Sequence, residues 1–171
     1  GERAMIVREP VGVVVSITSF NYPIALLTMK LGAALITGCT IVSKPSDETP
    51  LSTMRIAELF SEAGYPDGVF NVITGRGRDI GDALVTHKHT AKIAFTGGTN
   101  TGQRIGALAA QHCKRVTLEL GGQSPVIVCA DADLKVAVPA IVKHTFANSG
   151  QFCYRVGRIY VHSAIYNDFV T

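Results

Sequence analysis

The chain has 171 residues, about the length of one domain, and 47% of them are hydrophobic while 17% are charged. This composition can build a buried core and excludes a disordered chain. The net charge of +3 comes from scattered basic residues, so we predict neither a nucleic-acid-binding patch nor a membrane-surface helix. The longest apolar stretch, residues 22–36, is shorter than the roughly 20 residues that span a bilayer.

In chain order, strand and helix patterns alternate. Residues 11–17 form a mostly β-branched run, which is typical of a strand buried on both faces. Thr49 and Pro50 have the chemistry of an N-cap and a first helical residue. The full prediction is strand 11–17, helix 23–36, strand 39–43, helix 50–63, strand 69–73, helix 79–86, strand 92–95, helix 99–110, strands 116–120 and 126–129, helix 133–148, strand 158–161 and a last helix from Ser163.

This alternation predicts the fold class. Strands that alternate with helices of roughly 8 to 15 residues imply right-handed βαβ units and a parallel sheet. We therefore predict an α/β protein with a Rossmann-like open parallel sheet and flanking helices. Ligands of such sheets bind in the loops that leave the carboxyl ends of the strands, so we expect the functional residues in these loops.

The four cysteines are widely and unevenly spaced, with no Cys-x-x-Cys pair and no paired histidines. This spacing excludes a secreted disulfide scaffold and a zinc module, so no metal site is predicted. We expect free thiols in a reducing cytoplasm. Cys39 and Cys129 fall in apolar strands and are expected to be structural, and Cys113 has no motif around it.

Two glycine-rich loops each follow a strand and precede a helix. The loop from Gly75 through Gly77 to Gly81 fits a phosphate site and a simple tight turn equally well, and Arg78 beside it could meet a phosphate. The loop at residues 95–102 has bare backbone N–H groups at a helix N-terminus, which could hold a pyrophosphate.

Three further residues have the chemistry of a site. Asp47, three residues after Lys44 at a strand end, could accept the hydroxyls of a ribose, although a solvated turn explains the same pattern. Cys153 lies on a polar loop, which favours a reactive thiol over a structural one. Glu119 interrupts an apolar strand and is either a general base or an edge ion-pair partner. The five histidines have no catalytic spacing and are interpreted as structural or solvated.

Five segments of the chain form an ordered set of motifs. They are Ser-Phe-Asn-Tyr-Pro at 19–23, Lys-Pro-Ser-Asp at 44–47, Phe-Thr-Gly-Gly-Thr at 95–99, Glu-Leu-Gly-Gly-Gln-Ser-Pro at 119–125 and Gly-Gln-Phe-Cys at 150–153. Together they resemble the motifs of the aldehyde dehydrogenase superfamily, which are Pro-Trp-Asn-Phe/Tyr-Pro, Lys-Pro-Ala/Ser-Glu, Phe-Thr-Gly-Ser-Thr, Glu-Leu-Gly-Gly-Lys-Ser/Asn-Pro and Gly-Gln-x-Cys. The resemblance extends over essentially all of the chain.

The resemblance implies an NAD(P)-dependent oxidation of an aldehyde to a carboxylic acid through a thiohemiacetal and a thioester. Cys153 would be the nucleophile, Asn21 an oxyanion donor and Glu119 the general base that activates water. A CoA-acylating dehydrogenase and a catalytically silent nucleotide-binding relative are the alternatives. The presence of Glu119 favours hydrolysis.

The resemblance also implies the binding residues. The coenzyme is NAD, with NADP as the alternative, and the acidic group of Asp47 is expected to favour NAD. The implied coenzyme residues are Thr18, Lys44, Asp47, Gly77, Gly97, Gly98, Thr99 and Gly102. The implied substrate residues are Tyr22, Leu26, Met29, Phe152 and Tyr154, which suit an apolar aldehyde or a semialdehyde.

The resemblance finally implies a domain organisation. Residues 1–10 would belong to a subunit-bridging arm, 11–120 to a coenzyme-binding domain whose first part is absent, and 121–171 to the start of a second α/β domain, which is catalytic and carries the nucleophile loop. The full-length protein would be a homo-oligomer, either a dimer or a tetramer. The isolated chain is expected to be inactive.

Overall fold

The computed structural model describes residues 3–171 and divides the chain into two compact units, Gly1–Glu119 and Leu120–Thr171. Each unit is described by itself. Residues 3–10, in the expected arm, form no helix or strand and are exposed, and residues 1 and 2 of that arm lie outside the described part. Among the described residues, no helix is both long and apolar enough to cross a membrane.

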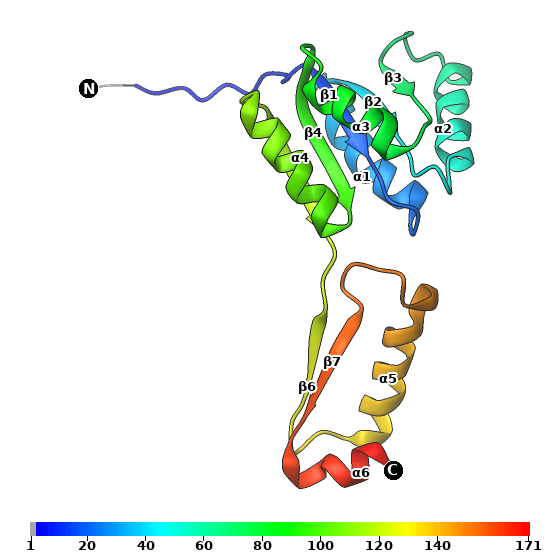
Figure 1. The fold of residues 1–171 in the computed structure, drawn as a ribbon, viewed down its shortest axis with the longest axis vertical. Coiled ribbons are helices and arrows are strands. Elements are labelled where there is room, and N and C mark those ends of the chain that lie inside the picture. Colours follow the sequence, from blue (N-terminus) through cyan, green and yellow to red (C-terminus); the bar gives the residue numbers. More distant parts are fainter. Residues whose placement is uncertain (1–2) are drawn as a thin grey trace. The chain divides into compact units, whose positions relative to one another are not determined.

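The first unit is a five-stranded α/β sheet (Figure 1). Its strands lie in the order β3-β2-β1-β4-β5, and β1 pairs in parallel with both β2 and β4, as β2 does with β3. The predicted α/β fold with a parallel sheet is therefore confirmed. The elements are β1 (Val13–Ile17), α1 (Pro23–Ile36), β2 (Thr40–Lys44), α2 (Leu51–Glu62), β3 (Phe70–Val72), α3 (Gly77–Thr86), β4 (Thr90–Gly97), α4 (Thr99–Gln111) and β5 (Arg115–Leu120).

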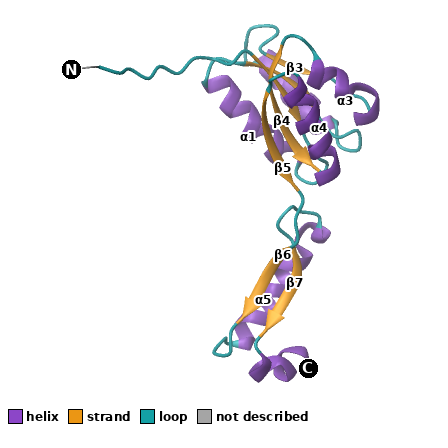
Figure 2. Cartoon of the chain, turned by 60° about the vertical axis from the view of Figure 1, so that its left-hand side comes forward, coloured by secondary structure: helices purple, strands orange, loops and turns teal. Residues whose placement is uncertain are grey.

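Helices cover both faces of this sheet. Helix α1 packs on β1, β2 and α2, whereas α3 and α4 pack on β4 and on each other. Figure 2 shows α1 on one side of the strands and α3 and α4 on the other. The chain order reverses between β1 and β4, which is the position where open α/β sheets bind ligands at their carboxyl edge.

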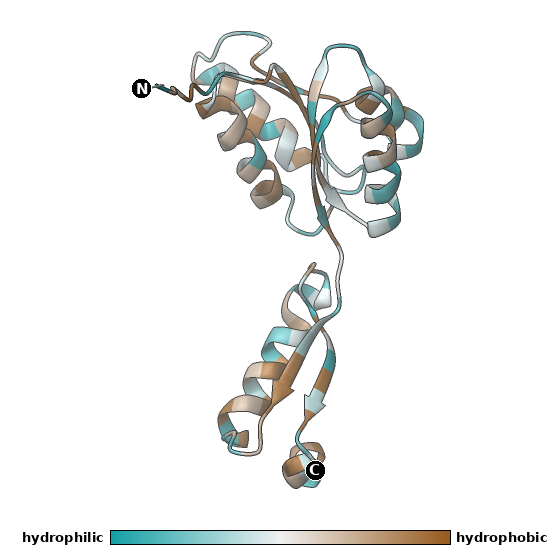
Figure 3. Ribbon diagram, turned by 90° about the vertical axis from the view of Figure 1, so that its left-hand side faces the viewer, coloured by the Kyte–Doolittle hydropathy of each residue, from teal (hydrophilic) through white to brown (hydrophobic). Residues whose placement is uncertain are grey.

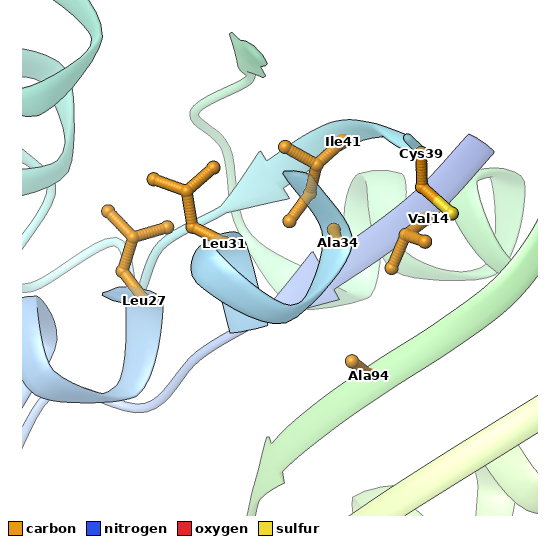
Figure 4. Packing of buried hydrophobic residues seen from close by; sticks show 7 residues of the cluster. All are labelled: Val14, Leu27, Leu31, Ala34, Cys39, Ile41 and Ala94. Atoms are coloured by element: carbon orange, nitrogen blue, oxygen red, sulfur yellow. The ribbon is translucent and has the colours of Figure 1, made fainter. Parts of the chain in front are cut away.

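The core of the first unit lies between α1 and the central strands (Figure 4). The buried cluster consists of Val14, Leu27, Leu31, Ala34, Cys39, Ile41 and Ala94. Strand β1 is buried on both faces, as its run of apolar residues predicts, since Val15 is 1% and Ser16 is 0% exposed. This packing makes β1 a rigid base for the loop that follows it.

The second unit contains a parallel pair of strands joined by a helix. Strands β6 (Ser124–Val128) and β7 (Val156–Val161) pair in parallel, and α5 (Leu134–Phe146) connects them. The Asp133 side chain caps α5 by accepting a hydrogen bond from the N–H of Lys135 at 2.9 Å. Two short 3-10 helices, η1 (Ala147–Gly150) and η2 (Ser163–Ile165), and helix α6 (Tyr166–Val170) complete the unit.

Three local predictions are wrong. Thr49 is not the N-cap of α2: its N–H donates to the carbonyl of Ser46 in a turn at 3.2 Å, and Pro50 takes the cap position. Helix α5 ends at Phe146 because Asn148 and Ser149 adopt left-handed backbone angles. Cys129 is exposed and lies just after β6, not within it.

Candidate active site

The loops at the carboxyl ends of β1 and β2 lie side by side. The N–H of Thr18, the first residue after β1, donates to the carbonyl of Lys44 at the end of β2 at 3.2 Å. Thr18 is 4% exposed, and its hydroxyl has no hydrogen-bond partner in the described part of the chain. A buried hydroxyl without a partner is costly, so a polar ligand at this edge would satisfy it.

Lys44 and Asp47 lie close enough at the end of β2 for their charges to interact. Lys44 is 3% exposed and its Nζ donates to the carbonyl of Pro45 at 2.9 Å. Burial lowers the pKa of Lys44, and the negative charge of Asp47 opposes that shift. A buried ammonium near a carboxylate fits the recognition of a polar, hydroxyl-bearing group such as a ribose.

A small cavity lies next to this pair. Asp47, Arg76, Gly77 and Arg78 line it, and its volume is about 350 Å³. The structure thus brings Asp47 and Gly77, two of the predicted coenzyme residues, to one site. It also adds two arginine residues, of which only Arg78 carries a signal in the sequence.

The second glycine-rich loop opens α4. Gly98 is the N-cap residue, so no side chain caps the first turn, and the turn contains no acidic residue. A methyl group added at Gly98 would meet no atom within 4 Å, which leaves open space in front of the helix N-terminus. The N–H groups of the first turn of a helix can bind an anion, as the predicted pyrophosphate site at Gly97 and Thr99 requires. The N–H of Gly102, the third predicted residue, donates instead to the carbonyl of Gly98 at 3.0 Å.

Asn21 is held by its own loop. The hydroxyl of Ser19 donates to Asn21 Oδ1 at 2.8 Å. This contact identifies the oxygen as the accepting end of the amide, so the NH₂ group is the end with which the side chain donates. Serine, which stands where the family motif has proline, therefore orients the predicted oxyanion donor.

Glu119 lines a cavity of about 1030 Å³ in the first unit, together with Lys30 and Met29. The Lys30 Nζ donates to Thr96 Oγ1 at 2.6 Å, and the charge of Glu119 acts on the same ammonium. Burial lowers the pKa of Lys30, while Glu119 opposes that shift. The sequence carries no pattern that predicts a site role for Lys30, which is a single cation within an apolar helix.

The other predicted substrate residues of the first unit lie elsewhere. Tyr22 and Leu26 are not among the residues that line the Glu119 cavity. Tyr22 is 40% exposed at the N-cap of α1, Leu26 is partly buried, and Met29 is 71% exposed. The structure therefore brings together Met29 and Glu119 but not the whole expected helix face.

Cys153 is exposed on the loop between η1 and β7. The loop is preceded by three residues with positive φ, namely Asn148 at 47°, Ser149 at 57° and Gly150 at 70°. Left-handed angles cost roughly 1–2 kcal/mol for each non-glycine residue and are concentrated at functional sites. The segment that leads into the loop thus contains two non-glycine residues, Asn148 and Ser149, with backbone angles that their side chains disfavour.

The residues before and after Cys153 carry aromatic rings that contact each other. The rings of Phe152 and Tyr154 meet edge to face with centroids 4.9 Å apart. The ring of His144, from α5, lies 5.3 Å from Phe152 and 5.7 Å from Tyr154. Phe152 is 7% exposed, so it anchors the loop, and Tyr154 is 58% exposed. His144 is a contact that sequence reasoning missed, because its spacing from the loop follows no simple period.

The described residues contain no group of three or more His, Cys, Asp or Glu side chains that could hold a metal ion. The predicted site residues offer a thiol, a carboxylate, an amide and a set of cationic and backbone N–H groups. In the first unit these groups gather around β1, β2, β4 and β5, and in the second unit around the loop before β7.

Comparison with known proteins adds a family to this geometry. A model described as the aldehyde dehydrogenase family matches residues 1–171. The phenylacetaldehyde dehydrogenase of Pseudomonas fluorescens is 49% identical over 168 residues, which cover 98% of this chain and 34% of that enzyme.

Solved structures give the same result. Betaine aldehyde dehydrogenase from Staphylococcus aureus, in complex with NAD+, matches with a TM-score of 0.92 and 42% identity over 95% of this chain and 32% of that one. A structure described as an E. coli NADP dependent enzyme matches with a TM-score of 0.91 and 43% identity over 95% of this chain and 34% of that one. The chain spans about a third of the length of these relatives.

Proposed function

Since the chain belongs to the aldehyde dehydrogenase family, we propose that the full-length protein oxidises an aldehyde to a carboxylic acid, with NAD or NADP as the hydride acceptor. The observation that carries this proposal is the match over all 171 residues, which includes Cys153 on its polar loop. The relatives described as NAD+-bound and as NADP dependent support either coenzyme.

Cys153 is the proposed nucleophile. Its thiolate attacks the aldehyde carbon, and a C–S bond forms as the carbonyl π electrons move to oxygen, which gives a thiohemiacetal. The exposed position of the thiol and the left-handed turn before it support this role. The buried ring of Phe152 fixes the loop on one side of the nucleophile.

Asn21 is the proposed stabiliser of the oxyanion, together with the backbone N–H of Cys153. Donors aimed at the developing negative charge are worth several kcal/mol of barrier reduction each. The Ser19–Asn21 hydrogen bond supports this role because it fixes the amide with its oxygen turned to serine. A substitution at Ser19 would therefore disturb the donor without removing it.

The coenzyme residues are proposed from the edge of the sheet. Thr18, Lys44 and Asp47 would hold the adenosine ribose, and the α4 N-terminus at Gly98 would hold the pyrophosphate. The orphaned hydroxyl of Thr18 and the uncapped first turn of α4 both fit a polar, anionic ligand. A bound nicotinamide coenzyme would supply the acceptor for the hydride that the thiohemiacetal loses.

Glu119 is the proposed general base for the last step. It takes a proton from water, whose oxygen attacks the thioester carbon and releases the carboxylic acid and the thiolate. Lys30 lines the same cavity, and the charge of Glu119 raises the pKa of Lys30 against the lowering by burial, which supports an electrostatic interaction between the two groups. A CoA-acylating enzyme would not need this base.

The substrate is proposed to be an apolar aldehyde or a semialdehyde. The rings of Phe152 and Tyr154 beside Cys153 provide an apolar surface for the first class. Four free thiols support a reducing compartment such as the cytoplasm. We also propose a homo-oligomer, with the first unit binding coenzyme and the second carrying the nucleophile.

The proposal is tested with the full-length protein, an aldehyde panel and both coenzymes, by following the absorbance of the reduced coenzyme. We expect turnover with a free carboxylic acid as product, and we expect Cys153→Ala to lower kcat by roughly 10³-fold or more. Cys129→Ala, at an exposed cysteine of the same unit, is the matched control and should retain activity. Normal turnover by Cys153→Ala would refute the assignment of Cys153 as the nucleophile. Turnover that strictly requires CoA would show that the thioester is released by acyl transfer to CoA and not by hydrolysis.

A further inference from the structure

We propose that His144 is a positioning residue for the nucleophile, and that it acts through the aromatic residues on either side of Cys153 in the sequence, Phe152 and Tyr154. This inference rests on the proposed function of Cys153. It adds a residue that lies outside the five motifs of the sequence. His144 does not touch the reacting atoms; it holds the turn that presents the thiol.

Cys153 lies in a four-residue turn. The N–H of Arg155 donates to the carbonyl of Phe152 at 3.3 Å, which closes a turn with Cys153 and Tyr154 at its two central positions. The turn carries both groups that the proposed reaction takes from Cys153, namely its thiol and its backbone N–H. A rotation within this turn would move both groups, so the order of the turn controls the geometry of the attack on the aldehyde.

Main-chain contacts hold one side of this turn. The carbonyl of Arg155 accepts a hydrogen bond from the N–H of Ser124, the first residue of β6, at 3.2 Å. A methyl group added at Gly122 would lie 3.2 Å from the carbonyl oxygen of Cys153, so the backbone at Gly122 approaches the turn closely. Both contacts involve backbone atoms of the turn, and the side chains of the turn are held by other groups.

Three aromatic rings in mutual contact hold these side chains. The planes of the Phe152 and Tyr154 rings meet at 64°, and the ring of His144 meets Phe152 at 77° and Tyr154 at 32°. All three pairs of centroids lie within 5.7 Å of each other, a separation at which aromatic pairs stabilise more than their buried area accounts for. His144 therefore contacts the first and the third residue of the turn at once, and a rotation that separates those residues breaks these contacts.

Helix α5 gives His144 a fixed support. His144 lies in the last turn of this helix, which packs on β7. Between the helix and the turn the chain passes through Asn148 and Ser149, whose left-handed backbone angles prevent the helix from continuing into the turn. The ring contacts of His144 therefore connect the end of a helix directly to a turn that the helix does not include.

The first test is amide hydrogen exchange of the full-length protein without aldehyde, followed by mass spectrometry of the peptide that contains residues 152–155. His144→Ala should speed exchange in this peptide about fivefold or more, because the turn opens more often once two ring contacts are lost. His144→Phe keeps an aromatic ring and should stay within about twofold of the unmodified protein. Lys135→Ala, at the opposite end of the same helix, is the control and should change nothing in this peptide.

The second test is steady-state kinetics of the same variants at a temperature where all of them are folded. His144→Ala should lower kcat roughly tenfold and leave KM within about twofold, since a misplaced thiol and N–H weaken the transition state more than the binding of substrate. His144→Phe should restore kcat.

Three results would overturn the inference while the proposed function stands: unchanged exchange in His144→Ala, no restoration by His144→Phe, or faster exchange with an unchanged kcat. If the unmodified protein oxidises no aldehyde, the proposed function fails and the inference fails with it. The exchange experiment then still shows whether His144 orders the turn.

Discussion

At the scale of single residues, Lys30 shows how α1 interacts with β4 and with the edge strand β5. Its ammonium donates to Thr96 near the end of β4 at 2.6 Å and lies within the field of Glu119 on β5. Burial lowers the pKa of Lys30 and the Glu119 carboxylate raises it. The protonation of Lys30 therefore depends on the carboxylate that we propose as general base.

This coupling gives a prediction with a definite sign. Because Glu119 raises the pKa of Lys30 against the lowering by burial, Glu119→Gln should lower that pKa further and release the proton at a lower pH. The measurement is the pH dependence of Lys30 acetylation, read by mass spectrometry of the full-length protein. Asp47→Asn, which acts on Lys44, is the control and should leave the Lys30 profile unchanged. An unchanged or raised pKa in Glu119→Gln would show that the two groups are not coupled.

The residues also differ in how far their sequence predicts them. Cys153 is exposed on a polar loop, as its neighbours Gly150 and Gln151 indicate. Lys30 and His144 could not be found in this way, because a lone cation in an apolar helix and a lone histidine carry no local pattern. Their contacts exist only once distant segments pack together.

At the scale of elements, the loop after β4 depends on a close approach of backbone and ring. A methyl group at Gly97 would lie 2.5 Å from the ring of Phe95, which is 4% exposed and cannot move aside easily. At Gly98 the same group would meet nothing within 4 Å. Two adjacent glycines therefore have different roles: one permits packing and the other leaves the helix N-terminus open.

Gly97→Ala should accordingly lower the free energy of unfolding by about 1–3 kcal/mol, which is the usual penalty of overpacking. Gly98→Ala should cost at most about 1 kcal/mol, since it replaces a favoured N-cap residue by a disfavoured one without any steric clash. Urea denaturation of the full-length protein checks both variants. Equal midpoints for the two would contradict the role assigned to the Phe95 ring.

Element boundaries were predictable where a residue such as proline or glycine marks them. The predictions were wrong where a local backbone conformation sets the boundary. Helix α1 begins at Pro23 and ends at Ile36, as the proline and the following glycine indicate. Helix α2 begins at Leu51, one residue later than predicted, because Thr49 belongs to a turn that starts at Ser46. Helix α5 ends at Phe146, two residues earlier than predicted, because Asn148 has left-handed backbone angles. The N-cap chemistry of Thr49 pointed to a start one residue too early, and Asn148 carries no signal that ends the helix.

At the scale of the whole molecule, each unit exposes large apolar side chains. On α1, Met29 is 71% and Ile36 is 88% exposed, and on α5, Val136 is 67% and Phe146 is 70% exposed. In Figure 3, which colours each residue by hydropathy, brown marks the hydrophobic residues of these helices. Exposed apolar faces of this size are typical of surfaces that another part of a protein or another copy covers.

We therefore predict that the isolated 171-residue chain self-associates and has no measurable aldehyde turnover, even where it binds coenzyme weakly. The uncovered faces drive association, and a chain about a third as long as its relatives lacks the surroundings that position the reactants. Light scattering gives the mass, and the absorbance of reduced coenzyme gives the activity. A monodisperse monomer that oxidises an aldehyde would overturn this prediction.

The central claim is that Cys153 carries the acyl group and Glu119 releases it, and the most direct measurement is peptide mass mapping after acid quenching. The full-length Glu119→Gln protein is mixed with an aldehyde and coenzyme and quenched within one turnover. The peptide that contains Cys153 should gain the mass of the acyl group, because the thioester forms but water is no longer activated. The peptide with Cys129 should gain no mass. The protein without the Glu119→Gln substitution should accumulate far less of the Cys153 adduct. Formation of the carboxylic acid with no acyl group on Cys153, or an adduct on another cysteine, would contradict the account.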